Sequence, residues 1–429
     1  MKQLLLGQTL SFNANPWFVA ADDAVQHIRR GAVLVEAGKI VAVGEEDKLK
    51  VSHPEAKIID HGDHLLMAGF VDSHAHFSQT AIIASWGKRL IDWLNTYTFP
   101  EESRFGDASY AADVAETYLD LNLSNGITTA CAYCTIHPES VNAYFEAAQK
   151  RGLRMLGGKV MMDRNAPENL RDTAQSGYDD SKALLGKWHG VDRLSYVITP
   201  RFAPTSTAEQ LEATGALWAE HPECLMQTHL SEQHEELAWV KTLFPAHQDY
   251  LAVYEHFGLL GPGAVMGHSI YLSDREWDAI RDAGASIAHC PTSNAFIGSG
   301  LFHATRSHTL GIRTGLATDV GGGSSFSMLR TMASAYEIGQ LRGDALHPAQ
   351  LLFMATVGSA EALHIGAEVG NLVAGKEADI IAIDLASTPV ITQRTARSET
   401  LWETIFPTIM LGDDRAISAV YSGGNRLNT

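Results

Sequence analysis

The sequence predicts an α/β fold, in which a (β/α)8 TIM barrel forms the middle of the chain and both chain ends build a small β-sandwich. Two observations lead to this prediction. Eight strand-like runs alternate with helical stretches across residues 69–368, and eight β/α units imply a closed parallel barrel. Residues 1–68 and 369–429 instead contain short runs with strand character, and neither end is long enough for a core of its own.

The two chain ends share the same β-rich character. Near the start, AVLVEAGKIVAVG consists of two runs of β-branched residues around Gly38, which is typical of a hairpin. Near the end, ADIIAIDL and AISAVYSGGNRL repeat this pattern after Gly375 and Lys376. We therefore expect the two ends to pair into one β-sandwich, and two unrelated β appendages are the alternative.

The middle of the chain alternates between strand-like and helical stretches. Ser273 and Asp274 give a helix-start signal, and Gly152 and Gly284 give helix-stop signals. An open, doubly wound sheet is the alternative to a barrel, but it predicts a phosphate-binding glycine fingerprint after the first strand, and SHAHFSQ is not one. The eight strand-like runs are VDSHAHF, ITTACAY, RMLGGKVMM, LSYVITPRF, CLMQTHL, AVMGHSI, ASIAHC and IRTGLAT.

Composition limits the class of protein. The chain has 429 residues, 45% of them hydrophobic and 19% charged, and a net charge of −18. This charge argues against a nucleic acid or an anionic membrane surface as partner. Four cysteines are few for a disulfide scaffold and fit a reducing compartment. The N-terminus lacks the features of a signal peptide, and no stretch has the apolar length of a membrane span. We expect a soluble cytoplasmic protein.

Histidines and an aspartate recur where the strand-like runs end. His74 and His76 end the first run, His229 the fifth and His268 the sixth, and Asp319 follows the eighth. Residues two apart on a strand point to the same face, and the carboxyl ends of barrel strands meet at one rim. Imidazoles with a carboxylate suit zinc, and also iron or manganese. The sequence therefore predicts a metal site, with zinc as the default ion.

The segment HLSEQHEE follows one of these histidines. Glu232 lies three residues after His229, and a carboxylate just past a metal ligand can shuttle protons. The alternative is a solvated acidic loop, which we expect for Glu235 and Glu236, and we expect His234 at the surface.

Three further features have structural interpretations. Cys131 and Cys134 lie at the second strand-like run, and we expect buried structural thiols rather than a redox pair. The glycines of 321–323 have no following lysine, so we expect close backbone packing rather than a phosphate cradle. The aromatic-rich insertion 84–107 could be a lid, a dimer contact or plain packing, and we favour packing and a dimer contact.

Taken together, these motifs resemble a known group of enzymes. MAGFVDSHAHF, QTHLSE, MGHSIYLS, AHCPTSN and LATDVGG, with GNLVAGKEADIIAID, are similar to motifs of the amidohydrolase superfamily. The resemblance covers essentially the whole chain. Within the superfamily, HAHFSQ, TPRFAPT, HCPTSNAFIGSGLF and TDVGGGSSFSML resemble the guanine deaminases.

This resemblance implies a zinc hydrolase that converts guanine to xanthine and ammonia in purine catabolism. It also implies one zinc ion per subunit, with iron possible, and a homodimer. The implied zinc ligands are His74, His76, His229 and Asp319. The implied catalytic residues are Glu232, His268 and Asp319. The implied guanine contacts are Gln79, Arg201, Phe202, His229, Glu232 and His268.

Other activities stay open at this point. A related aminohydrolase could act on another purine, a pterin or a triazine. An inactive scaffold would have lost metal ligands, and this sequence keeps them. A metal-storage protein is disfavoured by the single enclosed site that we predict.

Overall fold

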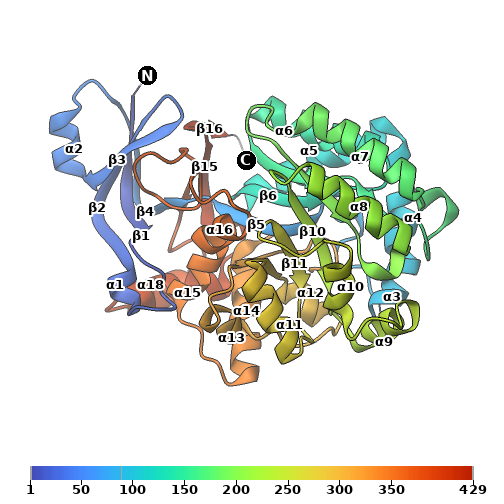
Figure 1. Cartoon of the computed structure of the whole chain (residues 1–429). Coiled ribbons are helices and arrows are strands. Elements are labelled where there is room, and N and C mark those ends of the chain that lie inside the picture. Colours follow the sequence, from blue (N-terminus) through green and yellow to red (C-terminus); the bar gives the residue numbers. More distant parts are fainter. Residues whose placement is uncertain (1, 88, 428–429) are drawn as a thin grey trace. The chain divides into compact units, whose positions relative to one another are not determined.

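The computed structural model describes residues 2–87 and 89–427 (Figure 1). The chain forms two compact units. The first consists of Met1–Asp72, Asp120–Thr129 and Ser327–Thr429, and the second of Ser73–Leu119 and Ala130–Phe326. The domain limits that we predicted at residues 68 and 368 stay predictions.

The first unit contains a seven-stranded sheet built from both ends of the chain. Strand β14 (Ile380–Ile383) pairs antiparallel with β4 (Lys57–Ala68), with Ile380 opposite Ala68, so the predicted pairing of the two ends is confirmed. Leu5, Val33 and Tyr421 are buried in one core cluster beside this sheet. The strand order is β16 (Asn425–Leu427), β15 (Ile417–Ser422), β14 (Ile380–Ile383), β4 (Lys57–Ala68), β1 (Gln3–Phe12), β2 (Val25–Glu36) and β3 (Lys39–Glu45).

Helices complete this unit. Their apolar residues are buried, for example Met332 on α14 and Ile409 on α18. The helical segments are α1 (Ala21–Ala24), α2 (Glu46–Ser52), α14 (Met328–Arg342), α15 (Pro348–Phe353), η6 (Met354–Gly358), α16 (Ser359–Ala362), α17 (Pro389–Thr395), α18 (Leu401–Leu411) and η7 (Asp414–Ala416).

The second sheet is the predicted parallel barrel. Each of the eight predicted runs contains a strand, so the barrel prediction is confirmed. Most of their residues are buried on both faces, as in parallel sheets covered by helices. The order is β13 (Thr314–Leu316), β12 (Ser286–His289), β11 (Ala264–His268), β10 (Leu225–Leu230), β9 (Ser195–Pro200), β7 (Arg154–Gly158), β6 (Ile127–Tyr133) and β5 (Phe70–His76), with β8 (Val160–Met161) also paired to β9.

Backbone hydrogen bonds join the first barrel strand to the chain that follows the last one. The amide of Asp319 donates to the carbonyl of His74 at 3.0 Å, and the amide of His76 donates to the carbonyl of Val320 at 2.6 Å. These bonds lie at the carboxyl end of β5. They therefore bring Asp319 beside the two histidines, although some 240 residues separate them in the sequence.

The barrel helices begin and end at the predicted signals. Ser273 caps α11 (Asp274–Ala283) through a capping box with Glu276. Gly152 ends α6 (Pro138–Arg151) and Gly284 ends α11, both in the left-handed conformation with φ of 65° and 67°, which glycine adopts without strain. None of the helices among residues 2–87 and 89–427 is long and apolar enough to cross a membrane.

The helices of the second unit follow the barrel strands (Figure 1). Helix α5 has its C-terminal turns in the first unit. The helical segments are η1 (Phe77–Ile82), α3 (Leu90–Trp93), η2 (Leu94–Thr98), α4 (Phe99–Glu102), η3 (Ser103–Gly106), α5 (Ala108–Ser124), α6 (Pro138–Arg151), η4 (Glu168–Leu170), α7 (Ala174–Trp188), η5 (Ala203–Thr205), α8 (Ala208–Glu220), α9 (His234–Leu243), α10 (Tyr250–His256), α11 (Asp274–Ala283), α12 (Pro291–Phe296) and α13 (Ala304–Thr309).

Candidate active site

The predicted metal ligands meet at the carboxyl ends of the barrel strands. His74 and His76 end β5, and His229 lies near the end of β10. Gly267 on β11 leaves room for the His74 ring, because a Cβ at this glycine would lie 2.9 Å from His74 Cε1. Asp319 follows β13 and turns with a left-handed φ of 49°, a costly conformation that clusters at functional sites.

The distances between the donor atoms fit one metal ion. His76 Nε2 and His229 Nε2 are 3.1 Å apart. Asp319 Oδ1 lies 3.4 Å from His74 Nε2 and 3.5 Å from His76 Nε2. Two ligands that are each about 2.1 Å from a tetrahedral ion lie roughly 3.4 Å apart. The four side chains are therefore arranged as a donor set that can hold a metal.

The protonation states of the side chains in this cluster also favour metal binding. The Nδ1 of His229 lies 2.7 Å from the carbonyl oxygen of Arg201. A carbonyl only accepts, so Nδ1 carries the hydrogen and the lone pair of Nε2 faces the cluster. Burial lowers the pKa of His76 and of His229 well below the usual range. Burial raises the pKa of Asp319, but the hydrogen bond and positive field of His74 and the other histidines lower it to about 2.

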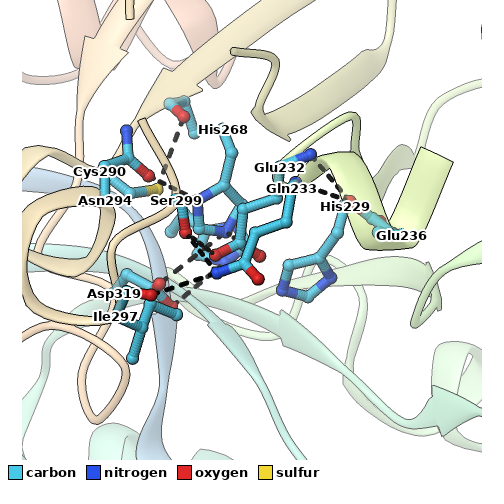
Figure 2. Close-up of polar contacts among 12 residues, drawn as sticks. His229, Glu232, Gln233, Glu236, His268, Cys290, Asn294, Ile297, Ser299 and Asp319 are labelled. Atoms are coloured by element: carbon cyan, nitrogen blue, oxygen red, sulfur yellow. Dashed lines mark hydrogen bonds and ion pairs between the residues drawn. The ribbon is translucent and has the colours of Figure 1, made fainter. Parts of the chain in front are cut away.

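Glu232 lies beside the cluster with its two oxygens in different environments (Figure 2). Ser299 Oγ donates to Glu232 Oε1 at 2.6 Å, and Glu232 Oε2 is 3.6 Å from His268 Nε2. Burial raises the pKa of the Glu232 carboxyl. The opposite nitrogen of His268, Nδ1, bonds Asn294 Oδ1 at 2.9 Å. Oε2 is therefore the oxygen of Glu232 that lies on the side of His268, where it can take up or release a proton.

One pocket joins the metal-binding cluster to the other predicted site residues. Gln79, Arg201 and Phe202 line it together with Glu232 and His268. Insertion 84–107 lines it too, through Leu90, Trp93 and Leu94. We predicted a packing role for this insertion, and Trp93 and Leu94 do pack against Phe202 in one buried cluster. The same two residues also form part of the pocket wall. The remaining lining residues are His76, His229, Ile297, Asp319 and Gly322.

Comparisons with known proteins agree with this geometry. Residues 65–427 match the Amidohydrolase family, and residues 31–56 match the imidazolonepropionase-like composite domain of bacteria. The chain belongs to the amidohydrolase family.

Individual relatives match this amidohydrolase over nearly its full length. The sequence is 41% identical to guanine deaminase of Escherichia coli (strain K12), over 96% of this chain and 93% of that one. The solved structure of E. coli guanine deaminase has a TM-score of 0.97 at 39% identity, over 99% of both chains. A guanine deaminase from C. acetobutylicum, solved with guanine bound in its active site, has a TM-score of 0.90 at 29% identity, over 100% of both chains.

The sequence interpretation of Glu236 was wrong. This amidohydrolase buries Glu236, and its Oε2 accepts from the amides of Glu232 at 2.7 Å and Gln233 at 3.2 Å (Figure 2). Tyr250 donates to its other oxygen at 2.9 Å. Glu236 is thus part of the support for Glu232 rather than a solvated acid. Glu235 and His234 are exposed, as predicted.

The sequence signal for Glu236 is incomplete. Gln233 and Glu236 form a capping box at the start of α9, but the usual sequence pattern for such a box has Ser, Thr, Asp or Asn at its first position. Reading the segment as a helix start would have placed the Glu236 carboxylate over the backbone of 232–233.

Sequence reasoning also missed the partner of Arg201. Arg201 Nη1 donates to Glu102 Oε2 at 2.7 Å, and both side chains are buried. Glu102 lies in the insertion, 99 residues earlier in the chain. The sequence offered only an acidic pair, Glu101 and Glu102, among aromatic residues.

The structural interpretations of the cysteines and glycines are confirmed. Cys131 and Cys134 are buried, and burial raises the pKa of Cys134 well above its usual value, which leaves an unreactive thiol. Gly323 packs tightly on the backbone, because a Cβ there would lie 1.8 Å from the carbonyl oxygen of Thr318.

Proposed function

We propose that this amidohydrolase is a guanine deaminase, which hydrolyses guanine to xanthine and ammonia in purine catabolism. The observation that carries the proposal is the pocket in which Arg201, Gln79 and Phe202 lie next to the donor set of histidines and Asp319. The guanine deaminases that match this chain nearly end to end support the same activity, and one of them was solved with guanine in its active site.

We infer that one zinc ion per subunit is held by His74, His76, His229 and Asp319, with iron as the alternative. The separations of their donor atoms, from 3.1 to 3.5 Å, support a single ion. A bound zinc ion lowers the pKa of a water molecule toward neutrality. Neutral imidazoles and an ionised carboxylate are the forms that bind metal, and the pKa shifts of His76, His229 and Asp319 favour those forms.

The proton transfers follow from two carboxyl groups in different environments. Asp319, with its low pKa, is ionised and accepts a proton from the attacking water. The water oxygen bonds to the carbon that bears the amino group. Glu232 gives the proton on Oε2 to the ring nitrogen. It then passes to the departing amine the proton that Asp319 took, and ammonia leaves as the C–N bond breaks. The remaining proton of the attacking water leaves the oxygen as the carbonyl of xanthine forms, and it restores the proton on Glu232. His268 Nε2 lies within 3.7 Å of both carboxylates. It is therefore placed to assist the transfer of the proton from Asp319 to Glu232.

Guanine recognition falls to three residues of the pocket wall. Arg201 has five N–H donors, of which Nη1 bonds Glu102, and others are free to bind the guanine carbonyl. Gln79 offers amide groups to the edge of the purine, and Phe202 offers an aromatic face for its ring.

Ammonia release by the purified, zinc-loaded protein tests the activity. We expect rapid release from guanine. We expect little from a pterin, whose second ring is larger than the five-membered ring of guanine, and little from an aminotriazine, which has no second ring to fill the pocket. A preference for the pterin or the triazine would contradict the proposal and favour a related aminohydrolase.

Arg201 gives a sharper prediction about specificity. 2-Aminopurine lacks the guanine carbonyl and should be deaminated about 100-fold less efficiently than guanine. A site discriminates by about 10⁴-fold when the analogue leaves a buried polar group without a partner. We expect weaker discrimination here, because Glu102 remains paired with Arg201 when the substrate lacks a carbonyl. Arg201→Met should lower kcat/KM for guanine and leave 2-aminopurine nearly unchanged, at equal zinc content. An unchanged guanine rate would mean that Arg201 serves only its ion pair.

Two further expectations accompany the activity. We propose a homodimer, which light scattering on the eluting protein tests. We also propose a cytoplasmic location, which the four cysteines support because none of them forms a disulfide in the described chain, and which fractionation of cells tests.

A further inference from the structure

Glu102 is a buried carboxylate that holds two guanine-contacting residues at once. Its Oε2 accepts from Arg201 Nη1 at 2.7 Å, and its Oε1 accepts from Gln79 Nε2 at 2.9 Å. Both bonds are buried. Among the described residues, the lining of the pocket includes Gln79 and Arg201 but not Glu102. Glu102 therefore acts from behind the pocket wall, and any effect on substrate passes through its two partners.

The charge of Glu102 suits this position. An ionised carboxylate only accepts hydrogen bonds, so each of its two oxygens can accept from one of the two donors at the same time. It also balances the buried guanidinium, which would otherwise add positive charge next to the metal-binding histidines. The ring of Phe99, one turn earlier on α4, lies 5.8 Å from Arg201 Cζ and supports the same side chain.

Glu102 also decides which way the Gln79 amide points. Gln79 Nε2 bonds Glu102, and Gln79 Oε1 accepts from the amide of Gly321 at 3.3 Å. A flipped amide would bring oxygen against the carboxylate and nitrogen against an N–H. The donors and acceptors that Gln79 presents to a purine edge are therefore set by Glu102 and Gly321 together.

We propose that Glu102 is a positioning residue for guanine specificity, which acts by holding Arg201 and Gln79 in their substrate-binding orientations. The inference rests on the proposed function and assigns a task to the insertion 84–107. The α4 segment of this insertion thereby takes part in substrate selection from outside the pocket.

Glu102→Gln tests the proposal at nearly constant shape. The amide offers one acceptor and one donor group, so it can keep Arg201 or Gln79 in place but not both. We expect the preference for guanine over 2-aminopurine to fall about 10- to 100-fold, mainly through KM for guanine, because displaced binding groups cost this much. Metal content per chain should stay at the wild-type level.

The neighbouring residue provides a matched control. Glu101 is a buried carboxylate on the same helix, but it bonds Tyr110 and Arg104 instead of the pocket residues. Glu101→Gln should leave KM and the substrate preference unchanged. Thermal melting of both variants shows whether each is folded to the same extent.

Combining the variants separates positioning from a general structural role. Because Glu102 holds both Arg201 and Gln79, Glu102→Gln should add only about 2- to 3-fold to the loss of guanine preference in an enzyme that already carries Gln79→Ala and Arg201→Met, since coupled residues are not additive. If the losses of guanine preference multiply fully when the variants are combined, this inference is overturned. It is also overturned if the Glu102→Gln enzyme has the same substrate preference as the Glu101→Gln enzyme. Neither result would contradict the proposed function. A wild-type enzyme that releases no ammonia from guanine would overturn the proposed function together with this inference.

Discussion

His229→Ala is expected to abolish metal binding and guanine deamination together. The substitution removes Nε2, which lies 3.1 Å from His76 Nε2 in the donor cluster. Losing a support behind a metal ligand already costs about 10- to 100-fold in affinity, and losing the ligand itself costs more. Elemental analysis should find close to one transition metal per wild-type chain and almost none in the variant, and ammonia release should fall below detection.

A control for this experiment lies five residues further along the chain. His234 is exposed at the start of α9, outside the donor cluster, so His234→Ala should keep both metal and activity. His74→Ala should behave like His229→Ala, because its Nε2 is 3.4 Å from Asp319 Oδ1. A metal-free preparation with full activity would refute the metal assignment.

Glu232→Gln is expected to keep the metal and to lose about 100-fold or more in kcat, the scale of general acid–base catalysis. Glutamine has nearly the same shape, and its Oε1 can still accept from Ser299, which bonds Glu232 Oε1 at 2.6 Å in the wild type. It carries no transferable carboxyl proton. Ammonia release under saturating guanine measures the loss, and elemental analysis checks the metal.

The pH dependence gives a second measurement on the same residue. Burial raises the pKa of Glu232, so its protonated form persists to higher pH than that of an ordinary carboxyl group. The rate limited by this acid should fall as the pH rises above that pKa, and Glu232→Gln should lack this decline. Glu235→Gln, at an exposed neighbour, should match the wild type. Near wild-type turnover in Glu232→Gln would show that Glu232 is only a loop residue.

Local patterns were enough to predict the fold and the metal-binding cluster. Alternation of strand-like and helical stretches predicted the barrel, because each β/α unit carries its own periodicity and helix signals. The two-residue spacing of His74 and His76 placed both rings on one face of a strand. The carboxyl ends of parallel barrel strands meet at one rim, so His229, His268 and Asp319 could be assigned to the same place without coordinates.

Only the tertiary structure decided which buried groups support these residues. Glu102 meets Arg201 across 99 residues, and Ser299 meets Glu232 across 67. Such pairs depend on how the insertion and the loops after the strands fold over the rim, and loops carry no periodic signal. Glu236 was misjudged for a related reason, since its charge suggested solvent while its position at a helix start aims it at the backbone of Glu232. The sequence shows which side chains can act as acids, bases or ligands. Which of them are buried, and which partners they then meet, depends on how the whole barrel packs.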